Sequence, residues 1–156
     1  MLRRLVLIAA LLLPLAAAAQ APNSKPVDIE ADRMEVDSVE KRAVFTGHVD
    51  VKREDTHLTS DRLVAIYTEE KQADGTTKNK VTQLEAEGSV TIVTKKQTIT
   101  GDWAKMDVEA NKLVVGGKVK VVQGETTLEG EQLSVDLDAD KSEMTGGRVK
   151  GSFVPK

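Results

Sequence analysis

The chain has 156 residues with 22 basic and 25 acidic side chains, and it contains no cysteine. Its length is enough for one domain, its net charge of −3 disfavours nucleic acid as a partner, and no disulfide can stabilise the fold. Packing alone must therefore hold the protein together, which is feasible because a domain of this size buries about two-thirds of its unfolded surface.

Residues 1–19 have the parts of a secretory signal peptide. Arg3 and Arg4 form a basic segment, and an apolar run of 15 residues that ends in alanines follows directly. We predict cleavage after Ala19 and export of the remaining chain, which begins with a polar lead-in over residues 20–26. The alternative is an uncleaved anchor helix, but the run is shorter than the roughly 20 residues that a membrane span needs.

From Val27 onward, apolar and polar residues alternate with a period of two, which is typical of half-buried β-strands. The segment "VDIEADRMEVD" (27–37) changes the parity of its apolar residues midway, which indicates a bulge or corner in an extended chain. The polar segment Thr68–Lys80 contains the hairpin signal Asp74-Gly75, and we interpret it as an insertion that lengthens one hairpin.

One pattern is written three times, as "AVFTGHVDVK", "LEAEGSVTIV" and "LVVGGKVKVV", each with a glycine two residues before a valine. The glycines are Gly47, Gly88 and Gly117, with a fourth Gly-x-Val at Gly147, and the acids 14 residues after the first three are Asp61, Asp102 and Glu131. A period near 30, apart from the insertion, predicts stacked units of about four short strands each. We expect the glycines at bends, and these acids, together with Asp32 of the opening segment, at turns or strand edges.

The apolar residues of each strand share one parity and the polar residues the other, as in antiparallel sheets with one covered face. Such strands must stack or curl to hide the apolar face, so the sequence predicts an elongated all-β jelly roll or solenoid with an aliphatic interior. A slot lined by short aliphatic side chains would suit acyl chains. The alternative is a filled core without a ligand.

No catalytic or metal-binding arrangement stands out. His48 and His57 are the two histidines, and we expect both to be solvated surface residues because no further zinc ligands stand at suitable spacing. The acids recur once per unit, which favours a structural role over a catalytic one. Trp103 is predicted on the outside of the sheet, as a half-buried residue or at an assembly surface. We expect neither enzyme activity nor a cofactor.

The segment 26–63 resembles the OstA-like family. Its pattern I-x-A-D-x-[hydrophobic] is met at residues 29–34, A-x-F-x-G-x-V-x-[apolar] at 43–51, and a second D-x-[apolar] at 61–63. Each motif alone is only a strand pattern, whereas their order and repetition are more specific. The resemblance extends over about residues 27–153.

The resemblance implies that residues 27–154 form a slightly twisted, V-shaped β-jellyroll of repeated antiparallel strands. It also implies a periplasmic protein that carries lipopolysaccharide, with the acyl chains in a hydrophobic groove, from an inner-membrane transport complex to an outer-membrane translocon. Carried over by position, the groove residues are Val36, Phe45, Val49, Val51, Leu63, Ala65, Tyr67, Val90, Ile92, Met106, Val108, Val119, Val121, Leu133, Val135 and Leu137.

An open jelly roll has two unpaired edges, which invite strand addition. We expect Val27 and Ile29 at the N-terminal edge to dock the inner-membrane partner, and Val149 and Phe153 at the C-terminal edge to dock the translocon. Head-to-tail self-association through the same edges is a further expectation. The competing readings are a membrane-anchored relative of the same fold, the N-terminal domain of the translocon itself, and a solenoid scaffold that binds no lipid.

Overall fold

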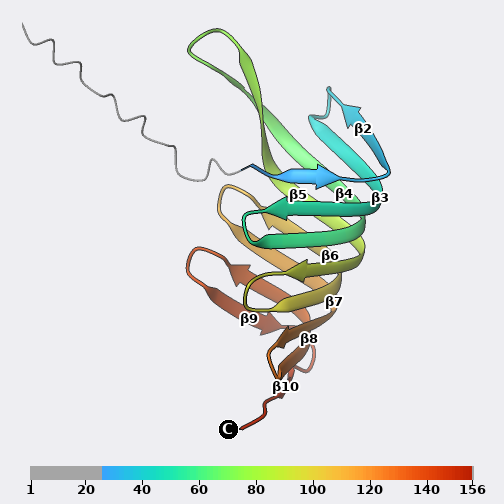
Figure 1. The fold of residues 1–156 in the computed structure, drawn as a ribbon, viewed down its shortest axis with the longest axis vertical. Helices are drawn as coiled ribbons and strands as arrows, with labels where there is room; N and C mark the ends of the chain where they lie inside the picture. Colours follow the sequence, from blue (N-terminus) through green and yellow to red (C-terminus); the bar gives the residue numbers. More distant parts are fainter. Residues whose placement is uncertain (1–25, 156) are drawn as a thin grey trace, which may run out of the picture.

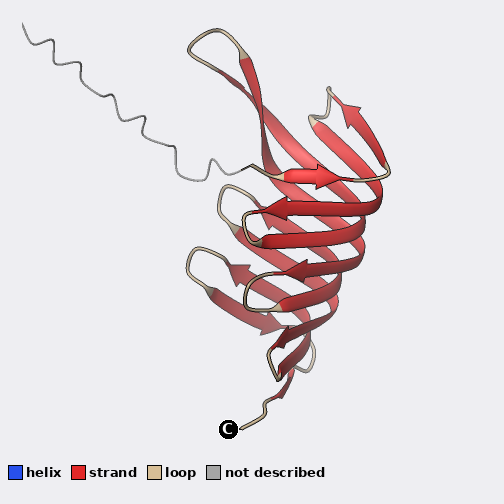
Figure 2. Ribbon diagram, in the orientation of Figure 1, coloured by secondary structure: helices blue, strands red, loops and turns tan. Residues whose placement is uncertain are grey.

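The structure, a computed structural model, describes residues 26–155, and every regular element in that part of the chain is a β-strand (Figure 1, Figure 2). The predicted signal peptide and most of the polar lead-in lie outside the described residues. The strands are β1 (Asp28–Glu30), β2 (Arg33–Asp37), β3 (Arg42–Arg53), β4 (Thr56–Lys71), β5 (Thr77–Val93), β6 (Thr98–Asp107), β7 (Lys112–Gln123), β8 (Thr126–Asp136), β9 (Lys141–Thr145) and β10 (Lys150–Ser152). Within the described range, no helix is long and apolar enough to cross a membrane.

All ten strands belong to one sheet, in which the strands from β3 to β8 pair antiparallel in chain order. At one end of the sheet β1 and β2 both pair with β3, and at the other end β9 and β10 both pair with β8. At each end of the sheet, two short consecutive strands thus take the place of one long strand. The elongated, antiparallel all-β architecture predicted from the sequence is confirmed.

The sheet folds along one line into two facing walls, because the strands from β3 to β8 bend near their middles. Shifts in the pairing register mark this line, for example between Thr46 and Val49 in β3 and between Glu87 and Val90 in β5. We call the half-sheet that contains β2 and β9 wall A, and the half that contains β1 and β10 wall B. The line where the walls meet is the corner, and the open side between the hairpin turns is the mouth.

The repeated glycines lie at the corner, where each faces the carboxylate of an acid in the neighbouring strand or, for Gly47, in the bend between β1 and β2. The pairs are Gly47 with Asp32, Gly88 with Asp61, and Gly117 with Asp102. At Gly88 the φ angle is 82°, in the left-handed region that favours glycine. A Cβ atom there would lie 2.5 Å from the Oδ2 atom of Asp61, closer than any side chain permits. The backbone angle therefore favours glycine, and any side chain at this position would also have to displace Asp61.

Two expectations about the repeat are wrong. Of the four acids only Asp32 lies at a bend, between β1 and β2, whereas Asp61 lies inside β4, Asp102 inside β6 and Glu131 inside β8. Each repeat is also built from two long bent strands rather than four short ones. The reason is that a corner within a continuous strand interrupts the apolar alternation in the same way as a turn does, so the local sequence does not separate the two.

The core fills the space between the walls and is almost entirely aliphatic. Leu63 on wall A and Ile92 on wall B are among its fully buried side chains. Burial of each such side chain contributes about 1.5–3 kcal/mol to folding. Near the corner, wall B places small residues inward, so that a Cβ atom at Gly101 would lie 2.6 Å from Val115 of wall A. These small residues allow the two walls to approach each other closely at the corner.

Trp103 lies on the outer face of wall A, as its parity predicted. It is half-buried, and its ring packs on the backbone of Gly116, its cross-strand neighbour. The Nζ atom of Lys105 is 5.9 Å from the centre of the ring. Because the ring covers a strand glycine that has no side chain of its own, packing within the sheet accounts for its position.

Candidate functional site

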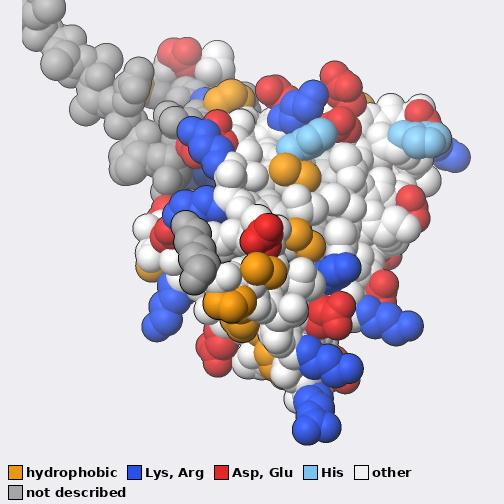
Figure 3. Space-filling view, turned by 60° about the horizontal axis from the view of Figure 1, so that its bottom comes forward, with side chains coloured by type: hydrophobic (Ala, Val, Ile, Leu, Met, Phe, Trp, Pro, Cys, Tyr) orange, Lys and Arg blue, Asp and Glu red, His pale blue; other side chains and the backbone are white. Residues whose placement is uncertain are grey.

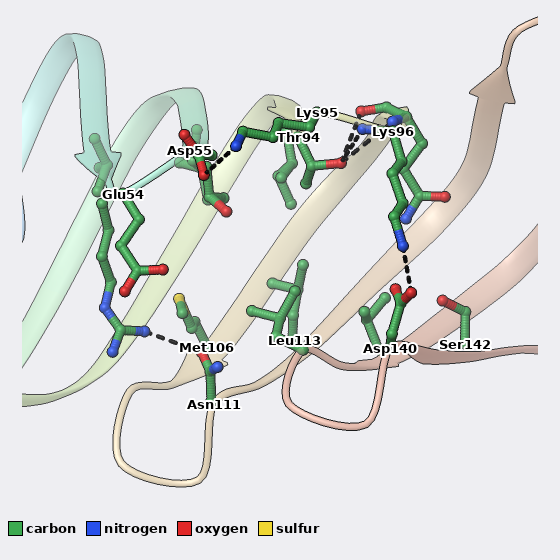
Figure 4. A pocket seen from close by; sticks show the side chains of 18 of the residues that line it. Glu54, Asp55, Thr94, Lys95, Lys96, Met106, Asn111, Leu113, Asp140 and Ser142 are labelled. Atoms are coloured by element: carbon green, nitrogen blue, oxygen red, sulfur yellow. Dashed lines mark hydrogen bonds and ion pairs between the residues drawn. The ribbon is translucent and has the colours of Figure 1, made fainter. Parts of the chain in front are cut away.

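A cavity of about 600 Å³ lies between the two walls at the mouth (Figure 4). Its interior is lined by apolar side chains from both walls: Val51, Leu58 and Ile92 from wall B, and Leu84, Met106, Leu113, Val135 and Leu137 from wall A. Because the walls meet at the corner and diverge toward the mouth, inward side chains there no longer fill the space between them. The predicted aliphatic interior is thus a tightly packed core at the corner and a groove at the mouth.

The rim of the cavity is polar and charged. Wall B contributes Arg53, Glu54, Asp55, Lys95 and Lys96, and wall A contributes Asn111, Asp140 and Ser142. Lys95 forms an ion pair with Asp55, at 3.2 Å between Nζ and Oδ2, that runs along wall B. Two other contacts cross the mouth. The Nη1 atom of Arg53 donates a hydrogen bond of 3.0 Å to the Oδ1 atom of Asn111, and Lys96 pairs with Asp140.

Such a site suits an amphipathic ligand. Apolar chains would lie against the aliphatic walls, and a polar or charged head would lie at the rim. In residues 26–155 no cluster of three or more His, Cys, Asp or Glu side chains is arranged to hold a metal ion. Among the described residues that line the cavity, the charged ones belong to strand ends and turns on its open side.

Both histidines lie away from the cavity and pair with acids. The Nδ1 atom of His48 is 2.7 Å from Asp32 at the corner, and its side chain is almost fully exposed. The hydrogen bond to Asp32 and the charge of its carboxylate raise the pKa of His48 above 6.5. The Nε2 atom of His57 is 2.6 Å from Asp50 on wall B. Each contact joins one ring to one acid, and among the described residues neither ring belongs to a group that could hold a metal ion.

Most of the predicted groove residues face inward, but they differ in burial. Those in the buried core are Val49, Val51, Leu63, Ala65, Val90, Ile92, Val108, Val119, Val121, Leu133 and Val135. Those that are half-buried are Phe45, Tyr67, Met106 and Leu137, whereas Val36 on the edge strand β2 is exposed. Of the sixteen, Val51, Ile92, Met106, Val135 and Leu137 line the cavity. The structure therefore separates the residues that surround the open space from those that only pack.

The predicted groove set omits seven buried inward residues: Leu58, Leu84, Ala86, Ile99, Ala104, Leu113 and Val115. For some the signal was present, because Leu84 and Ala86 precede Gly88 as Ala43 and Phe45 precede Gly47. The rim residues had no such signal. Arg53 and Asn111 are 58 positions apart, and nothing in the local pattern says that their turns face each other.

The two predicted docking edges differ in exposure. Val27 and Ile29 are half-buried and pack against the core, with Ile29 paired to Val51 of β3. At the other end Phe153 is 68% exposed and Val149 is 47% exposed. Figure 3 shows hydrophobic side chains gathered at the end of the molecule that carries β9 and β10. Val149 and Phe153 are therefore more accessible than Val27 and Ile29, and the N-terminal end exposes other apolar side chains instead: Met34, Val36 and Val39.

The insertion forms the distal part of the β4–β5 hairpin, as its Asp-Gly signal predicted. The two strands stay paired as far as Lys71 and Thr77, beyond the last partners that β3 and β6 provide. Lys41 and Lys80 connect it to the rim of wall A through ion pairs with Glu69 and Glu109. The long hairpin extends past the body of the sheet (Figure 1).

Comparisons with known proteins agree with this architecture. The model of the family "LptA/(LptD N-terminal domain) LPS transport protein" matches residues 28–114 and 98–154. Its two overlapping matches fit the internal repeat. The family is one of transport proteins, which confirms the expectation that the chain is not an enzyme.

Individual relatives are more distant. The crystal structure of LptH from Pseudomonas aeruginosa, described as the LptA-homologous periplasmic component of the lipopolysaccharide transport device, superposes with a TM-score of 0.69 at 21% identity. It covers 85% of this chain and 98% of that one. An uncharacterized protein of Rhizobium meliloti (strain 1021) is 35% identical over 48 residues, which are 31% of this chain and 26% of that protein. The first of these matches supports the fold, and the second spans only about a quarter of the relative.

Proposed function

The chain belongs to the family of lipopolysaccharide-transport proteins that contains LptA and the N-terminal domain of LptD, and on this premise we propose that it carries lipopolysaccharide through the periplasm. The acyl chains lie in the groove between walls A and B, and the saccharide head projects from the mouth. In this role the chain receives the lipid from an inner-membrane transport complex and passes it to an outer-membrane translocon.

The observation that carries the proposal is the cavity. Its volume of about 600 Å³ lies within the range of 300–1,000 Å³ that is usual for ligand sites, and its interior is aliphatic. Each CH₂ group of an acyl chain that leaves water contributes about 0.8 kcal/mol. A lipid with several chains is therefore held strongly, and transfer between carriers is possible only if successive sites offer nearly equal environments. Net movement then requires energy that is supplied elsewhere.

Strand addition at the two ends of the sheet would connect such carriers into a path. The N-terminal edge, which contains Ile29 in β1, would face the inner-membrane complex. The C-terminal edge, beside which Phe153 is exposed, would face the translocon. Self-association head to tail uses the same two edges. Support comes from the unpaired outer sides of the terminal strands and from the apolar side chains beside them.

Site-specific photo-crosslinking in cells tests the lipid path. A photoreactive residue at Val51 or at Met106 faces the cavity, whereas Lys52 on the same strand as Val51 faces outward and serves as the matched control. We expect lipopolysaccharide adducts at the first two positions and none at the third. A folded, exported protein without adducts at either inward position would favour a solenoid scaffold that binds no lipid.

Substitution of the C-terminal edge tests the docking surface. We expect Phe153→Asp to abolish co-purification with the outer-membrane partner and to reduce self-association. Val93→Asp, at an apolar residue that is 41% exposed at the end of the central strand β5, is the control and should change neither. Unchanged assembly of the Phe153→Asp variant would contradict the role of this edge.

A further inference from the structure

Two side-chain contacts bridge the mouth of the groove, and each joins a cation of wall B to a polar side chain of wall A. Arg53 reaches Asn111 in the turn between β6 and β7, and Lys96 reaches Asp140 in the turn between β8 and β9 (Figure 4). Both lie above the cavity, whose lining includes all four residues. A lipid whose head projects from the mouth must pass between or displace these contacts.

The ion pair between Lys96 and Asp140 is weak enough for Lys96 to exchange Asp140 for another anion. Their side chains are 63% and 74% exposed, and ion pairs as exposed as this contribute little to stability. Water or another anion can therefore replace Asp140 at small cost. Other charged contacts at the rim, such as that between Lys95 and Asp55, run along one wall and leave the width of the mouth unchanged.

Arg53 is not fully satisfied by its bridge. Within the part of the chain that the structure describes, its Nε atom is buried and has no hydrogen-bond partner, although its Nη1 atom donates to Asn111. A buried donor without an acceptor is unfavourable, and a guanidinium group offers its Nε and Nη atoms together to a phosphate or carboxylate. The Nε–H group of Arg53 is thus an unused hydrogen-bond donor at the rim of an apolar cavity.

We propose that Arg53–Asn111 and Lys96–Asp140 form a clasp across the mouth, and that the anionic headgroup of the bound lipid opens it by taking Arg53 and Lys96 as its own partners. The inference rests on the proposed function and adds to it the headgroup chemistry, a phosphate, and the residues that select it. A ligand that consists of acyl chains alone would occupy the same cavity but would not bind Arg53 or Lys96. The two contacts of the clasp would then form again above it.

Two double variants separate the clasp from its cations. Asn111→Gly with Asp140→Gly removes the wall A partners and leaves both cations, and glycine accepts the left-handed φ angles of 53° and 51° at these positions. Arg53→Gln with Lys96→Gln removes the cations themselves. Glu69→Ala, which breaks an ion pair along wall A, is the matched control. Circular dichroism verifies that each protein is folded.

The measurement is equilibrium binding of diphosphoryl lipid A, and of the same lipid without its phosphates, to the purified chains at fixed ionic strength. For the phosphorylated lipid we expect the glycine variant to bind about two- to fivefold more tightly, since the clasp no longer competes. The glutamine variant should bind it about tenfold more weakly because charge-assisted hydrogen bonds are lost. The dephosphorylated lipid should show no such loss, and the control should match the unaltered chain.

The outcomes distinguish this inference from the function on which it rests. If the unaltered chain binds lipid but both double variants shift in the same direction or not at all, the clasp is wrong and the groove remains. Equal loss for the phosphorylated and dephosphorylated lipids would also overturn it. If the unaltered chain binds neither lipid, the proposed function fails and the clasp fails with it.

Discussion

The corner and the mouth of the sheet are built from the same strands but by different interactions. At the corner, glycines with left-handed backbone angles lie against carboxylates, and the inward side chains of the two walls interlock. At the mouth, apolar side chains such as Met106 stay half-exposed, and the walls touch through the Arg53–Asn111 and Lys96–Asp140 contacts. The walls are thus joined by close packing at the corner, and by two polar contacts at the mouth, of which the Lys96–Asp140 pair is exposed.

Core truncation should give the largest contrast between the two regions. Leu63 is fully buried on wall A, so Leu63→Ala should lower the free energy of unfolding by about 2–5 kcal/mol. Met106→Ala, on the same wall but at the mouth, removes a half-buried side chain and should cost less than about 2 kcal/mol. Urea unfolding followed by circular dichroism measures both. Equal losses would mean that the mouth is packed as tightly as the core.

The corner glycines give the next largest effect. Gly75→Ala, at the tip of the β4–β5 hairpin with open space around it, should cost only the left-handed backbone energy, about 1–2 kcal/mol. Gly88→Ala has the same backbone cost and must also displace Asp61, which adds about 1–3 kcal/mol. The double variant Gly88→Ala with Asp61→Ala should recover most of the difference. Independent, additive losses would show that the two residues do not interact.

Breaking the clasp should hardly affect stability. Asp140→Gly removes an exposed ion pair, and we expect the free energy of unfolding to change by less than about 1 kcal/mol. Unfolding at low and at high salt measures this change and shows how much of it is electrostatic. A loss close to that of Leu63→Ala would mean that the mouth is a structural element of the fold.

The smallest effect concerns pH. The hydrogen bond to Asp32 raises the pKa of His48 above its ordinary value of 6.5 in the folded state. Below pH 6.5 the histidine is protonated in both states, and the pair makes its full contribution to the free energy of unfolding. It is lost as the pH rises through the raised folded-state pKa. A nuclear magnetic resonance titration should find the imidazole of His48 titrating above 6.5, and Asp32→Asn should return it toward that value. An unchanged titration in the variant would exclude Asp32 as the cause.

The fold was predictable because its determinants are local and repeated. Alternation of apolar residues indicated strands, and the change of parity around Ala31 and Asp32 indicated the break that separates β1 from β2 on different walls. The partner of each repeated acid was not predictable. Asp61 contacts Gly88, 27 positions away across the long hairpin, and that contact depends on the pairing register rather than on sequence pattern.

The groove was predictable only as a set of inward positions. Parity places Val49 and Val51 on the same face, but it does not tell that Val49 is confined to the core while Val51 lines the cavity. That difference depends on distance from the corner, which is a property of the folded walls. The rim contacts depend on the same property, because they join turns from opposite walls that are far apart along the chain.

The acid–glycine pairs at the corner also give the molecule a polarity. Along the ridge an acid-bearing strand alternates with a glycine-bearing one, beginning with Asp32 and ending with Gly146 and Gly147, which lie against Glu131. A second copy stacked in the same orientation would continue both the alternation and the antiparallel strand directions. A copy stacked head to head would place two Asp32 carboxylates side by side. The alternation of acids and glycines along the corner therefore continues only when copies stack head to tail.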